Sequence, residues 1–282
     1  MKKMATALLG LALAGAVFTG CGGGNRAQDL DHHDHAKVGI LAHMNASEEK
    51  LNEIMKRVDE TWTSKFSHDY VYYDRLTAMQ MGLNAGNIQE MSLYESVAHY
   101  LSDRDGSLEV VEHQGMKLVD SFCCALRQED KELKEKMDEA IEGMRADGTL
   151  DKLTKAYITD LQKDSEPPSV PLPDDVKGAP LKVAVTGDLP PLDLVRADGK
   201  AAGFNTAFLA ELGRRLGRSV EIVQVDSAGR AAALKSKKVD VIFWATVPFG
   251  ESEVPADIDK PEGVELTLPY YRDNIVHVEK KE

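Results

Sequence analysis

The sequence predicts an α/β protein built from two mostly parallel sheets with flanking helices. Apolar runs of strand length alternate with amphipathic stretches of helix length, which is the pattern of successive β-α-β units. A proline-rich, polar stretch over residues 163–180 interrupts this alternation, and the apolar run 181–185 restarts it. The 282 residues are also enough for two domains, since a domain takes about 100–150 residues.

The N-terminus predicts an exported protein. Two lysines precede an apolar stretch over residues 5–18, which is typical of a secretory signal peptide and too short to span a membrane. Small residues then precede Cys21, and this arrangement resembles a bacterial lipobox. We therefore expect residues 1–20 to be cleaved, Cys21 to be lipidated and the protein to be extracytoplasmic, anchored to the bacterial membrane through lipid only. The alternative is an ordinary signal peptide with a chance cysteine.

The charge balance argues against polyanionic partners. The chain has 47 acidic and 34 basic residues, and removal of residues 1–20 would change its net charge from −13 to −15. Such an excess disfavours nucleic acid and anionic headgroups as partners, but it mainly reflects solubility and identifies no ligand.

The first half of the chain alternates strands with helices. Asn45, with Glu48 three residues later, forms a capping-box signal, and Asp74 is the expected cap of another helix, which Gly86 ends. The predicted elements are a strand over 37–42, a helix after Asn45, a strand over 70–73, a helix over 76–83, a strand over 88–93, a helix over 95–101, and strands over 108–111 and 122–126.

The second half begins with helices and then returns to the alternation. Asp147, Gly148 and Thr149 are expected to break one helix and begin the next. The predicted elements are helices over 133–144 and 150–157, a surface linker over 163–180, a strand over 181–185, a helix over 204–216 closed by Gly217, and strands over 220–225 and 239–243.

Two neighbouring cysteines lie in the predicted strand over 122–126. Cys123 and Cys124 can be two buried thiols or a redox pair, and their apolar surroundings favour buried thiols.

The segment from Leu181 resembles the first lobe of a known family of binding proteins. The segment begins with the sequence LKVAVTGDLPPL, which is followed by DGK at 198–200, GFN at 203–205 and KVDVI at 238–242. Together these motifs are similar to the polar-amino-acid type (family 3) of ABC-transporter solute-binding proteins. The stretch from Leu268 to Val278 resembles that family's first hinge strand.

The N-terminal half resembles the rest of the same family, in permuted order. The resemblance implies a two-lobed periplasmic-binding-protein-like fold of type II, in which a cut in a surface loop has exchanged the order of the lobes. Glu282 is then expected near Lys37. The implied domains are a signal peptide over 1–20, a flexible tether over 21–36, lobe 2 over 37–120, a hinge strand over 121–127, terminal helices of lobe 1 over 128–162, a linker over 163–180, lobe 1 over 181–268, and a hinge strand into lobe 2 over 269–282.

The resemblance places a ligand between the lobes, beyond the ends of the strands. It implies an arginine in lobe 1 for a ligand carboxylate and an acid in lobe 2 for a ligand ammonium group. Ser252 and Tyr94 hold those positions, so we expect free α-amino acids to bind poorly. The candidate ligand-binding residues are Met44, Asn45, Tyr94, Glu95, Thr186, Asp188, Leu189, Trp244, Ala245 and Thr246.

Three of these residues have two interpretations each. Trp244 can be a stacking platform for an apolar or cyclic ligand, or a core side chain. Asn45 can help to bind an anion at a helix start or only cap its helix. Glu95 takes the position of the missing acid if the alignment with the family is shifted by one residue.

The leading prediction is a monomeric, lipid-anchored receptor that captures a small polar or aromatic solute for an ABC permease, with no cofactor and no catalytic activity. The alternatives are a non-transport sensing or interaction protein with a degenerate cleft, and a dehydratase-like enzyme using Glu95, His43 or Asp188. A tract of His and Asp over residues 31–35 has the composition of a metal site, and weak adventitious binding is the favoured interpretation.

Overall fold

The computed structural model describes residues 37–42, 52, 69–111, 118–176, 178–246 and 262–281. Several predicted features lie outside these residues: the signal peptide, Cys21, the tether with its His and Asp tract, His43, Met44, Asn45, nearly all of the helix after Asn45, and Ser252. The side chain of Thr246 lies outside them as well.

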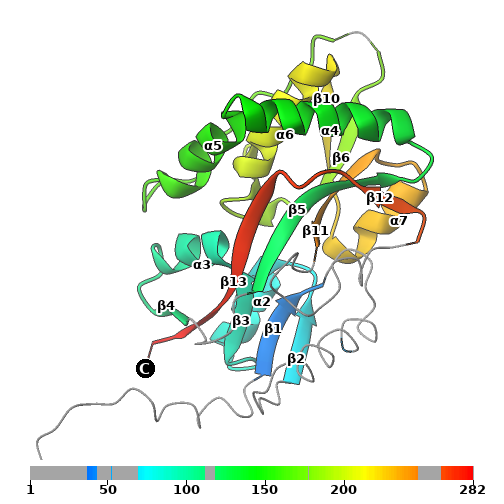
Figure 1. The fold of residues 1–282 in the computed structure, drawn as a ribbon. Coiled ribbons are helices and arrows are strands. Elements are labelled where there is room, and N and C mark those ends of the chain that lie inside the picture. The colour runs from blue at the N-terminus through cyan, green and yellow to red at the C-terminus, as the bar shows by residue number, and fades with distance from the viewer. Residues whose placement is uncertain are drawn as a thin grey trace, which may run out of the picture.

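One continuous mixed sheet runs through the described structure from end to end (Figure 1). The strands follow one another in the order β10-β6-β11-β5-β13-β3-β1-β2, while β12 pairs with β5 and β4 pairs with β13. Their bounds are Val220–Gln224 for β10, Leu181–Val185 for β6, Val241–Thr246 for β11, Leu118–Arg127 for β5, Tyr271–Lys280 for β13, Glu90–Tyr94 for β3, Lys37–Leu41 for β1, Asp69–Tyr73 for β2, Val264–Leu266 for β12 and Leu108–Val111 for β4.

Lobe 1 is the half of this sheet around β6. Strands β10, β6 and β11 are parallel, and β5 joins them in the antiparallel sense. Helices α4 (Lys131–Ala146) and α6 (Phe204–Leu216) pack together over this lobe, and the short helix α7 (Arg230–Lys235) contacts β11 (Figure 1). Helix α5 (Thr149–Thr154) continues α4 after a turn and runs into a π-helical turn over Lys155–Thr159.

Lobe 2 is the half around β1. Strand β1 lies between β2 and β3, and all three are parallel. Helix α2 (Leu76–Asn84) follows β2, and α3 (Glu95–Ser102) follows β3. Each lobe is therefore a mostly parallel sheet with flanking helices, and the predicted two-lobed fold is confirmed.

Two long antiparallel strands connect the lobes. β5 pairs with β11 and β12 at one end, and β13 pairs with β3 and β4 at the other. Between those ends the two strands pair with each other, from Tyr271 opposite Phe122 to Ile275 opposite Leu118. The hinge strand predicted over 121–127 is β5, which begins at Leu118, three residues before the predicted boundary, because its pairing with β13 extends beyond the apolar core of the segment.

The start of β1 and the end of β13 lie at the same end of lobe 2. Val38 pairs with Glu90, and Glu90 pairs on its other side with Glu279, so only β3 separates the two segments. The backbone N–H of Lys281 also donates to the carbonyl of Ser107 in lobe 2.

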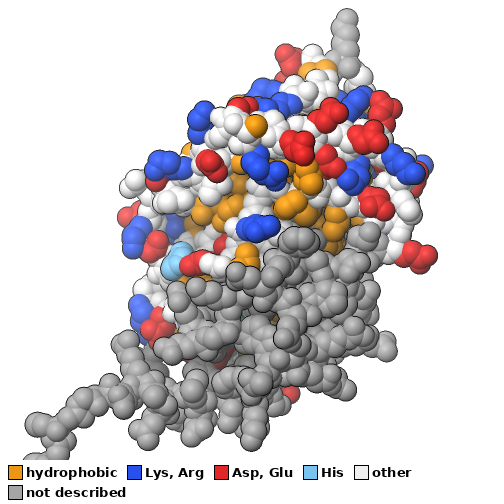
Figure 2. All heavy atoms as spheres, in the orientation of Figure 1, with side chains coloured by type: hydrophobic (Ala, Val, Ile, Leu, Met, Phe, Trp, Pro, Cys, Tyr) orange, Lys and Arg blue, Asp and Glu red, His pale blue; other side chains and the backbone are white. Residues whose placement is uncertain are grey.

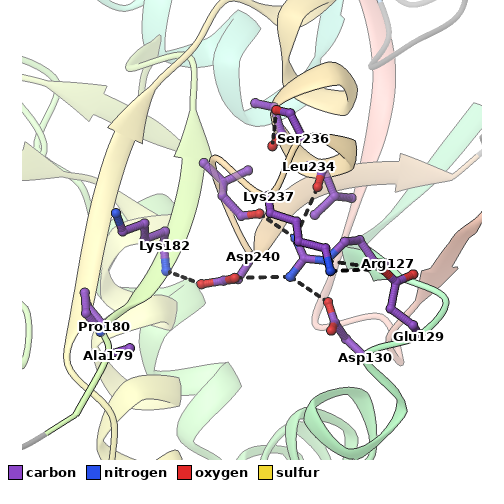
Figure 3. Close-up of polar contacts among 12 residues, drawn as sticks. Arg127, Glu129, Asp130, Ala179, Pro180, Lys182, Leu234, Ser236, Lys237 and Asp240 are labelled. Atoms are coloured by element: carbon purple, nitrogen blue, oxygen red, sulfur yellow. Dashed lines mark hydrogen bonds and ion pairs between the residues drawn. The ribbon is translucent and has the colours of Figure 1, made fainter.

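A buried arginine joins the distant chain segments that form lobe 1 (Figure 3). The Nη1 atom of Arg127, at the end of β5, donates to the carbonyls of Leu234 at 3.1 Å and Val239 at 2.7 Å. Its Nη2 atom lies 3.1 Å from Oδ1 of Asp240, whose Oδ2 accepts the backbone N–H of Lys182. The strand that returns from lobe 2 is therefore fixed to β6, α7 and the turn before β11 by one guanidinium group.

The proline-rich segment is held against lobe 1. The N–H of Val170 donates to the carbonyl of Ala201, and the N–H of Val220 donates to the carbonyl of Pro173. Ala201 belongs to β9 (Ala201–Ala202), part of a small antiparallel sheet with β7 (Asp188–Leu189) and β8 (Asp193–Val195). The sequence did not predict this sheet, because its strands are too short to show alternation.

Two local predictions were wrong. The N-cap residue of α2 is Arg75, one residue after the predicted Asp74, and its side chain makes no capping hydrogen bond. The expected strand over 239–243 is instead β11, over Val241–Thr246, because Val239 and Asp240 belong to the turn after α7. The sequence also did not predict α7, whose six residues are too few for helical periodicity.

The visible surface carries charges of both signs. In Figure 2 acidic and basic side chains intermix over lobe 1, and hydrophobic side chains gather below them, beside the residues that are not described. Within the described ranges, no helix is long and apolar enough to cross a membrane.

Candidate ligand-binding cleft

The two lobes meet where parallel strands end. Thr186 follows β6, Asp226 follows β10, and Arg75 follows β2, while Tyr94 ends β3. Strand β7 of lobe 1 lies against helix α2 of lobe 2. The carboxyl ends of parallel strands are where α/β folds bind ligands, so this junction is the candidate cleft.

A buried carboxylate forms the lobe 1 side of the cleft. Asp193 is 3% exposed and accepts hydrogen bonds from Oγ1 of Thr186 at 3.1 Å and from the backbone N–H of Gly187 at 2.9 Å. Burial raises the pKa of Asp193, although Arg230 and these hydrogen bonds favour its ionised form.

Asp188 reaches from lobe 1 to the start of a lobe 2 helix. The backbone N–H groups of Thr77 and Leu76, in the first turn of α2, are near enough to its carboxylate to favour the ionised form. Burial raises the pKa of Asp188, and these N–H groups together with Arg75 oppose that rise. Its Oδ2 atom is buried and has no hydrogen-bond partner among the described residues.

Arg230, the first residue of α7, lies among groups from both lobes. Its charge interacts with Asp193 and Asp188 of lobe 1 and with Tyr94 of lobe 2, while burial lowers its pKa. In the described part of the chain its one hydrogen bond runs from Nη2 to Oγ of Ser227, at 3.3 Å. Its Nε atom is buried without a partner there. A guanidinium has five N–H donors, so the described residues use only a small part of its hydrogen-bonding capacity.

The hinge strands contribute two more carboxylates. Tyr94 hydrogen-bonds Asp120 of β5, and burial followed by the charge of Asp120 raises the pKa of its hydroxyl. Its ring meets Phe122 at a centroid distance of 4.7 Å. Asp273 of β13 accepts the backbone N–H of Ser96 at 3.3 Å and its hydroxyl at 2.5 Å. Burial raises the pKa of Asp273 to about 6.

Two sets of polar contacts join the lobes. Nε of Arg75 donates to Oδ1 of Asp226 at 2.7 Å, and about half of each side chain is exposed, 46% and 53%. Elsewhere Nζ of Lys163, in the linker, lies 2.7 Å from Oδ1 of Asp103, just after α3. Nη2 of Arg104 also donates to the carbonyl of Ser165. The structure thus has the lobes in direct contact.

Three predicted site residues come together in this cleft: Tyr94, Thr186 and Asp188. Trp244, in β11, is 1% exposed and packs with Ala231 and Leu234 of α7 in the core of lobe 1. This burial favours the core interpretation, and Nε1 of Trp244 has no partner among the described residues. Leu189 packs against the main core cluster, and Ala245 is 8% exposed in β11.

Glu95 lies beside the hinge with its carboxylate engaged. Oε2 accepts the side-chain amide of Asn274 at 2.5 Å, and Oε1 lies 3.7 Å from Nε2 of His99. Met44, Asn45, the side chain of Thr246 and the candidate base His43 are outside the described residues.

The sequence reasoning missed the arginines and most of the carboxylates. It considered the ends of four strands but not those of β2 and β10, which carry Arg75 and Asp226, nor the start of α7, where Arg230 lies. Asp120 and Asp273 lie within strands β5 and β13, so a search of strand ends did not include them. The available signal was that polar residues follow β2 and β10 as they follow the other parallel strands.

No three or more His, Cys, Asp or Glu side chains of the described chain are grouped as a metal site. The tract over residues 31–35 lies outside it.

Comparison with known proteins matches part of the chain to one family. Residues 181–254 match the model of the bacterial extracellular solute-binding proteins, family 3. This stretch includes β6, α6, β10 and most of the lobe 1 side of the cleft. This family consists of extracellular solute-binding proteins of bacteria. No curated protein matches the chain in sequence.

Several solved structures have a similar fold at low identity. The probable amino-acid ABC transporter extracellular-binding protein ytmK from Bacillus subtilis is 11% identical, with a TM-score of 0.42 over 88% of this chain and 84% of its own. The GluR0 ligand-binding core from Nostoc punctiforme, solved with L-glutamate, is 9% identical, with a TM-score of 0.39 over 88% and 85%. Full-length CbnR, complexed with its target DNA, is 12% identical, with a TM-score of 0.44 over 91% and 68%.

Proposed function

We propose that this protein captures a small polar solute between its lobes and delivers it to an ABC importer. The observation that carries the proposal is a pair of buried atoms of opposite character that have no partner among the described residues: Nε of Arg230, a donor, and Oδ2 of Asp188, an acceptor. Buried polar atoms in folded proteins nearly always have partners, and unsatisfied ones cost free energy. A solute with both an acceptor and a donor would satisfy the two atoms together.

The position of this pair supports the same function. Arg230 is surrounded by groups of both lobes, and two hinge strands connect those lobes. Hinge closure around a small ligand is a common motion of such folds. The family match, which covers the lobe 1 residues of the pair, also favours solute capture. The burial of Trp244 removes the stacking platform, so we propose a polar rather than an aromatic solute.

We propose that the protein works as a monomer outside the cytoplasm, anchored through lipid on Cys21. The supports are the signal-like stretch over 5–18, the small residues before Cys21 and the extracytoplasmic family. A Cys21→Ser variant expressed in a bacterial host should lose incorporation of labelled fatty acid and move from the membrane fraction to the soluble fraction. Equal labelling of the variant and the parent would contradict the anchor.

We also propose that the chain is circularly permuted relative to family 3. The described residues of lobe 2 are 37–42 and 69–111, and those of lobe 1 include 128–160, 181–246 and 264–266, so the family-matched lobe comes last in the chain. Only β3 separates the start of β1 from the end of β13, as a cut between formerly adjacent segments requires. The linker over 163–180 runs along lobe 1 and would join the old termini. Cuts in exposed loops are well tolerated.

Solute binding is tested by thermal unfolding against a panel of amino acids, peptides, carboxylic acids, amines and sugars. A ligand at 100 times its dissociation constant adds about 2.7 kcal/mol and raises the midpoint by several degrees. We expect one chemical class to do so, and we expect the shift to vanish in Arg230→Ala. Arg272→Ala is the matched control, because Arg272 is exposed in β13 and should leave the shift intact. The earlier expectation that free α-amino acids bind poorly is tested in the same panel.

A non-transport sensing or interaction protein is the second candidate. It is favoured by the direct contacts between the lobes, which close the cleft with the protein's own side chains. If no panel member shifts the midpoint of the parent or of Arg272→Ala, this candidate replaces the transport receptor. A dehydratase has no comparable support, since Glu95 is engaged by Asn274 and His99.

A further inference from the structure

We propose that residues 162–166 form a strap that holds the two lobes in their closed arrangement, with Arg104 of lobe 2 as its anchor. The strap belongs to lobe 1, where it follows the π-helical turn after α5. In Figure 1 helix α5, which precedes the strap, and helix α3, which precedes Arg104, lie on the same side of the hinge strands. The strap is thus a third connection between the lobes, beside β5 and β13.

Arg104 is oriented for this contact by its own lobe. It lies just after the end of α3, and its guanidinium carbon is 3.5 Å from the centroid of the Tyr100 ring. Its Nη1 atom donates to the carbonyl of Tyr100 at 2.9 Å. A cation is favoured at this place, because the last turn of a helix has carbonyls without helical partners and the negative end of the helix dipole. The ring and this hydrogen bond fix the guanidinium group, and its other amino group reaches lobe 1.

The strap presents two backbone carbonyls to that amino group. Nη2 of Arg104 donates to the carbonyl of Gln162 at 3.3 Å and to the carbonyl of Ser165. The backbone N–H of Ser165 donates to the carbonyl of Gln162 at 3.0 Å, so both acceptors belong to one closed turn. Hydrogen bonds from a charged donor are stronger than those between neutral groups. Arg104 therefore binds an acceptor pair whose positions are already set.

An ion pair accompanies this contact but contributes less to it. Nζ of Lys163 lies 2.7 Å from Oδ1 of Asp103, the residue that ends α3. The two side chains are 75% and 33% exposed. An ion pair this open to solvent contributes little to stability. We therefore assign the role of anchor to Arg104.

The strap is fixed to lobe 1 on both sides. Before it, the backbone N–H of Asp160 donates to the carbonyl of Lys155 and closes the π-helical turn. At its end, Oε2 of Glu166 lies 3.2 Å from Nη2 of Arg196, and Val170 then hydrogen-bonds β9. A segment held at both ends cannot follow lobe 2 when the lobes separate. Opening of the lobes must therefore break the hydrogen bonds of the strap to Arg104.

The strap is distinct from the ion pair at the cleft. Arg75 and Asp226 also join the lobes, but about half of each side chain is exposed. Salt and water screen such a pair. Arg104 instead donates to backbone carbonyls, which cannot move independently of the turn that carries them. We therefore expect Arg104 to hold the lobes together more strongly than Arg75 does.

The strap has a consequence for solute capture, and this step alone rests on the proposed function. A solute that binds between the lobes enters only when they are apart. Its measured affinity is then reduced by the fraction of the protein that the strap holds closed. The contact itself is made by the protein's own groups and does not depend on any solute.

The test measures the distance between the lobes in the full chain, without added solute, by electron–electron double resonance. Spin labels are attached to Asn84→Cys in α2 of lobe 2 and to Glu135→Cys in α4 of lobe 1, both exposed positions. The chain also carries Cys21→Ser. Cys123 and Cys124 are buried and should stay unlabelled.

Arg104→Ala should give a longer mean distance between the labels than the parent. The matched control is Arg218→Ala, because Nη2 of Arg218 also donates to two linker carbonyls, those of Ala179 and Pro180, but within lobe 1. The control should leave the distance unchanged. If Arg104→Ala fails to fold, Arg104→Lys replaces it and should also lengthen the distance, since an ammonium group lacks the planar set of N–H donors.

Arg75→Ala completes the test by separating the strap from the cleft pair. A smaller change in Arg75→Ala than in Arg104→Ala supports the strap. The strap is refuted if Arg104→Ala keeps the distance of the parent, or if the Arg218→Ala control opens as far as Arg104→Ala. Solute capture is measured separately by thermal unfolding of the parent. If no panel solute shifts that midpoint, the proposed function fails while the distances still decide on the strap.

Discussion

Asp120 of β5 and Asp273 of β13 lie directly opposite each other where the two hinge strands pair. Both are buried, with 3% and 6% of their surface exposed. Directly opposed residues of an antiparallel pair project to the same face, so the hinge presents two carboxylates side by side. The pKa of the Tyr94 hydroxyl, raised mainly by burial, is raised further by both of them. The bridge between the lobes therefore carries buried charge.

The stability of the protein should depend on the protonation of Asp273. Burial raises the pKa of its carboxyl from 3.8 to about 6, so the folded state binds this proton more tightly than the unfolded chain does. The ionised carboxylate then destabilises the fold above pH 6 by about 3 kcal/mol, and this cost fades as the pH falls toward 4. Urea unfolding between pH 7.5 and 4.5 should show the parent gaining stability relative to Asp273→Asn as the pH falls. Parallel pH profiles for the two proteins would refute this role for Asp273.

Gly203 is required at the start of α6. Its φ is +98°, and a Cβ atom built there would lie 2.6 Å from the carbonyl oxygen of Pro191 and 2.8 Å from that of Leu192. Both carbonyls accept N–H groups of the first turn of α6, so neither can easily move. Gly203→Ala should lower the free energy of unfolding by at least about 2 kcal/mol. Gly106→Ala, in open space at an ordinary φ, should change it by less than about 1 kcal/mol. Equal values from urea unfolding would contradict the steric argument.

Sequence periodicity predicted the lobes well because their elements are locally determined. The helix over 204–216 shows a clear apolar stripe, ends at Gly217 with φ +60°, and has the predicted bounds. The strand over 181–185 was likewise predicted from its apolar run and its boundaries. Short elements such as α7 and the sheet of β7, β8 and β9 were missed, since two to six residues cannot display a period.

The cleft was predicted less completely because its contacts join distant residues. Asp188 was predicted, but the helix α2 against which its strand β7 lies belongs to the other lobe, and that contact is not set by local sequence. Trp244 shows the opposite difficulty. It ends an apolar run, and nothing in the run tells a cleft residue from a core residue until the helix that covers it is known.

Arg127 should be essential for the assembly of lobe 1. Its side chain is 10% exposed and serves two carbonyls and the carboxylates of Asp130 and Asp240. Arg127→Met should cost about 3–5 kcal/mol, because it leaves buried acceptors and charges unpaired. Arg127→Lys should lower the free energy of unfolding less than Arg127→Met does, but it should not match the parent, since an ammonium group cannot reproduce the planar set of N–H donors of a guanidinium. Lys131→Met, at an exposed site nearby, should cost less than about 1 kcal/mol. Urea unfolding at neutral pH measures all three, and equal losses for Arg127→Met and Lys131→Met would refute the assignment.

The thiols of Cys123 and Cys124 should be inert in the folded protein. They are 4% and 0% exposed, and burial raises the pKa of Cys123 to about 12 and also raises that of Cys124. Adjacent strand residues point to opposite faces, which opposes a disulfide between them. A Cys21→Ser variant leaves only these two cysteines. In the native protein near pH 8, neither thiol should react with a chromogenic disulfide reagent, whereas both should react once denaturant is added. Thiolate is the reactive form, so rapid reaction of either cysteine in the native state would show an accessible thiolate and revive the redox interpretation.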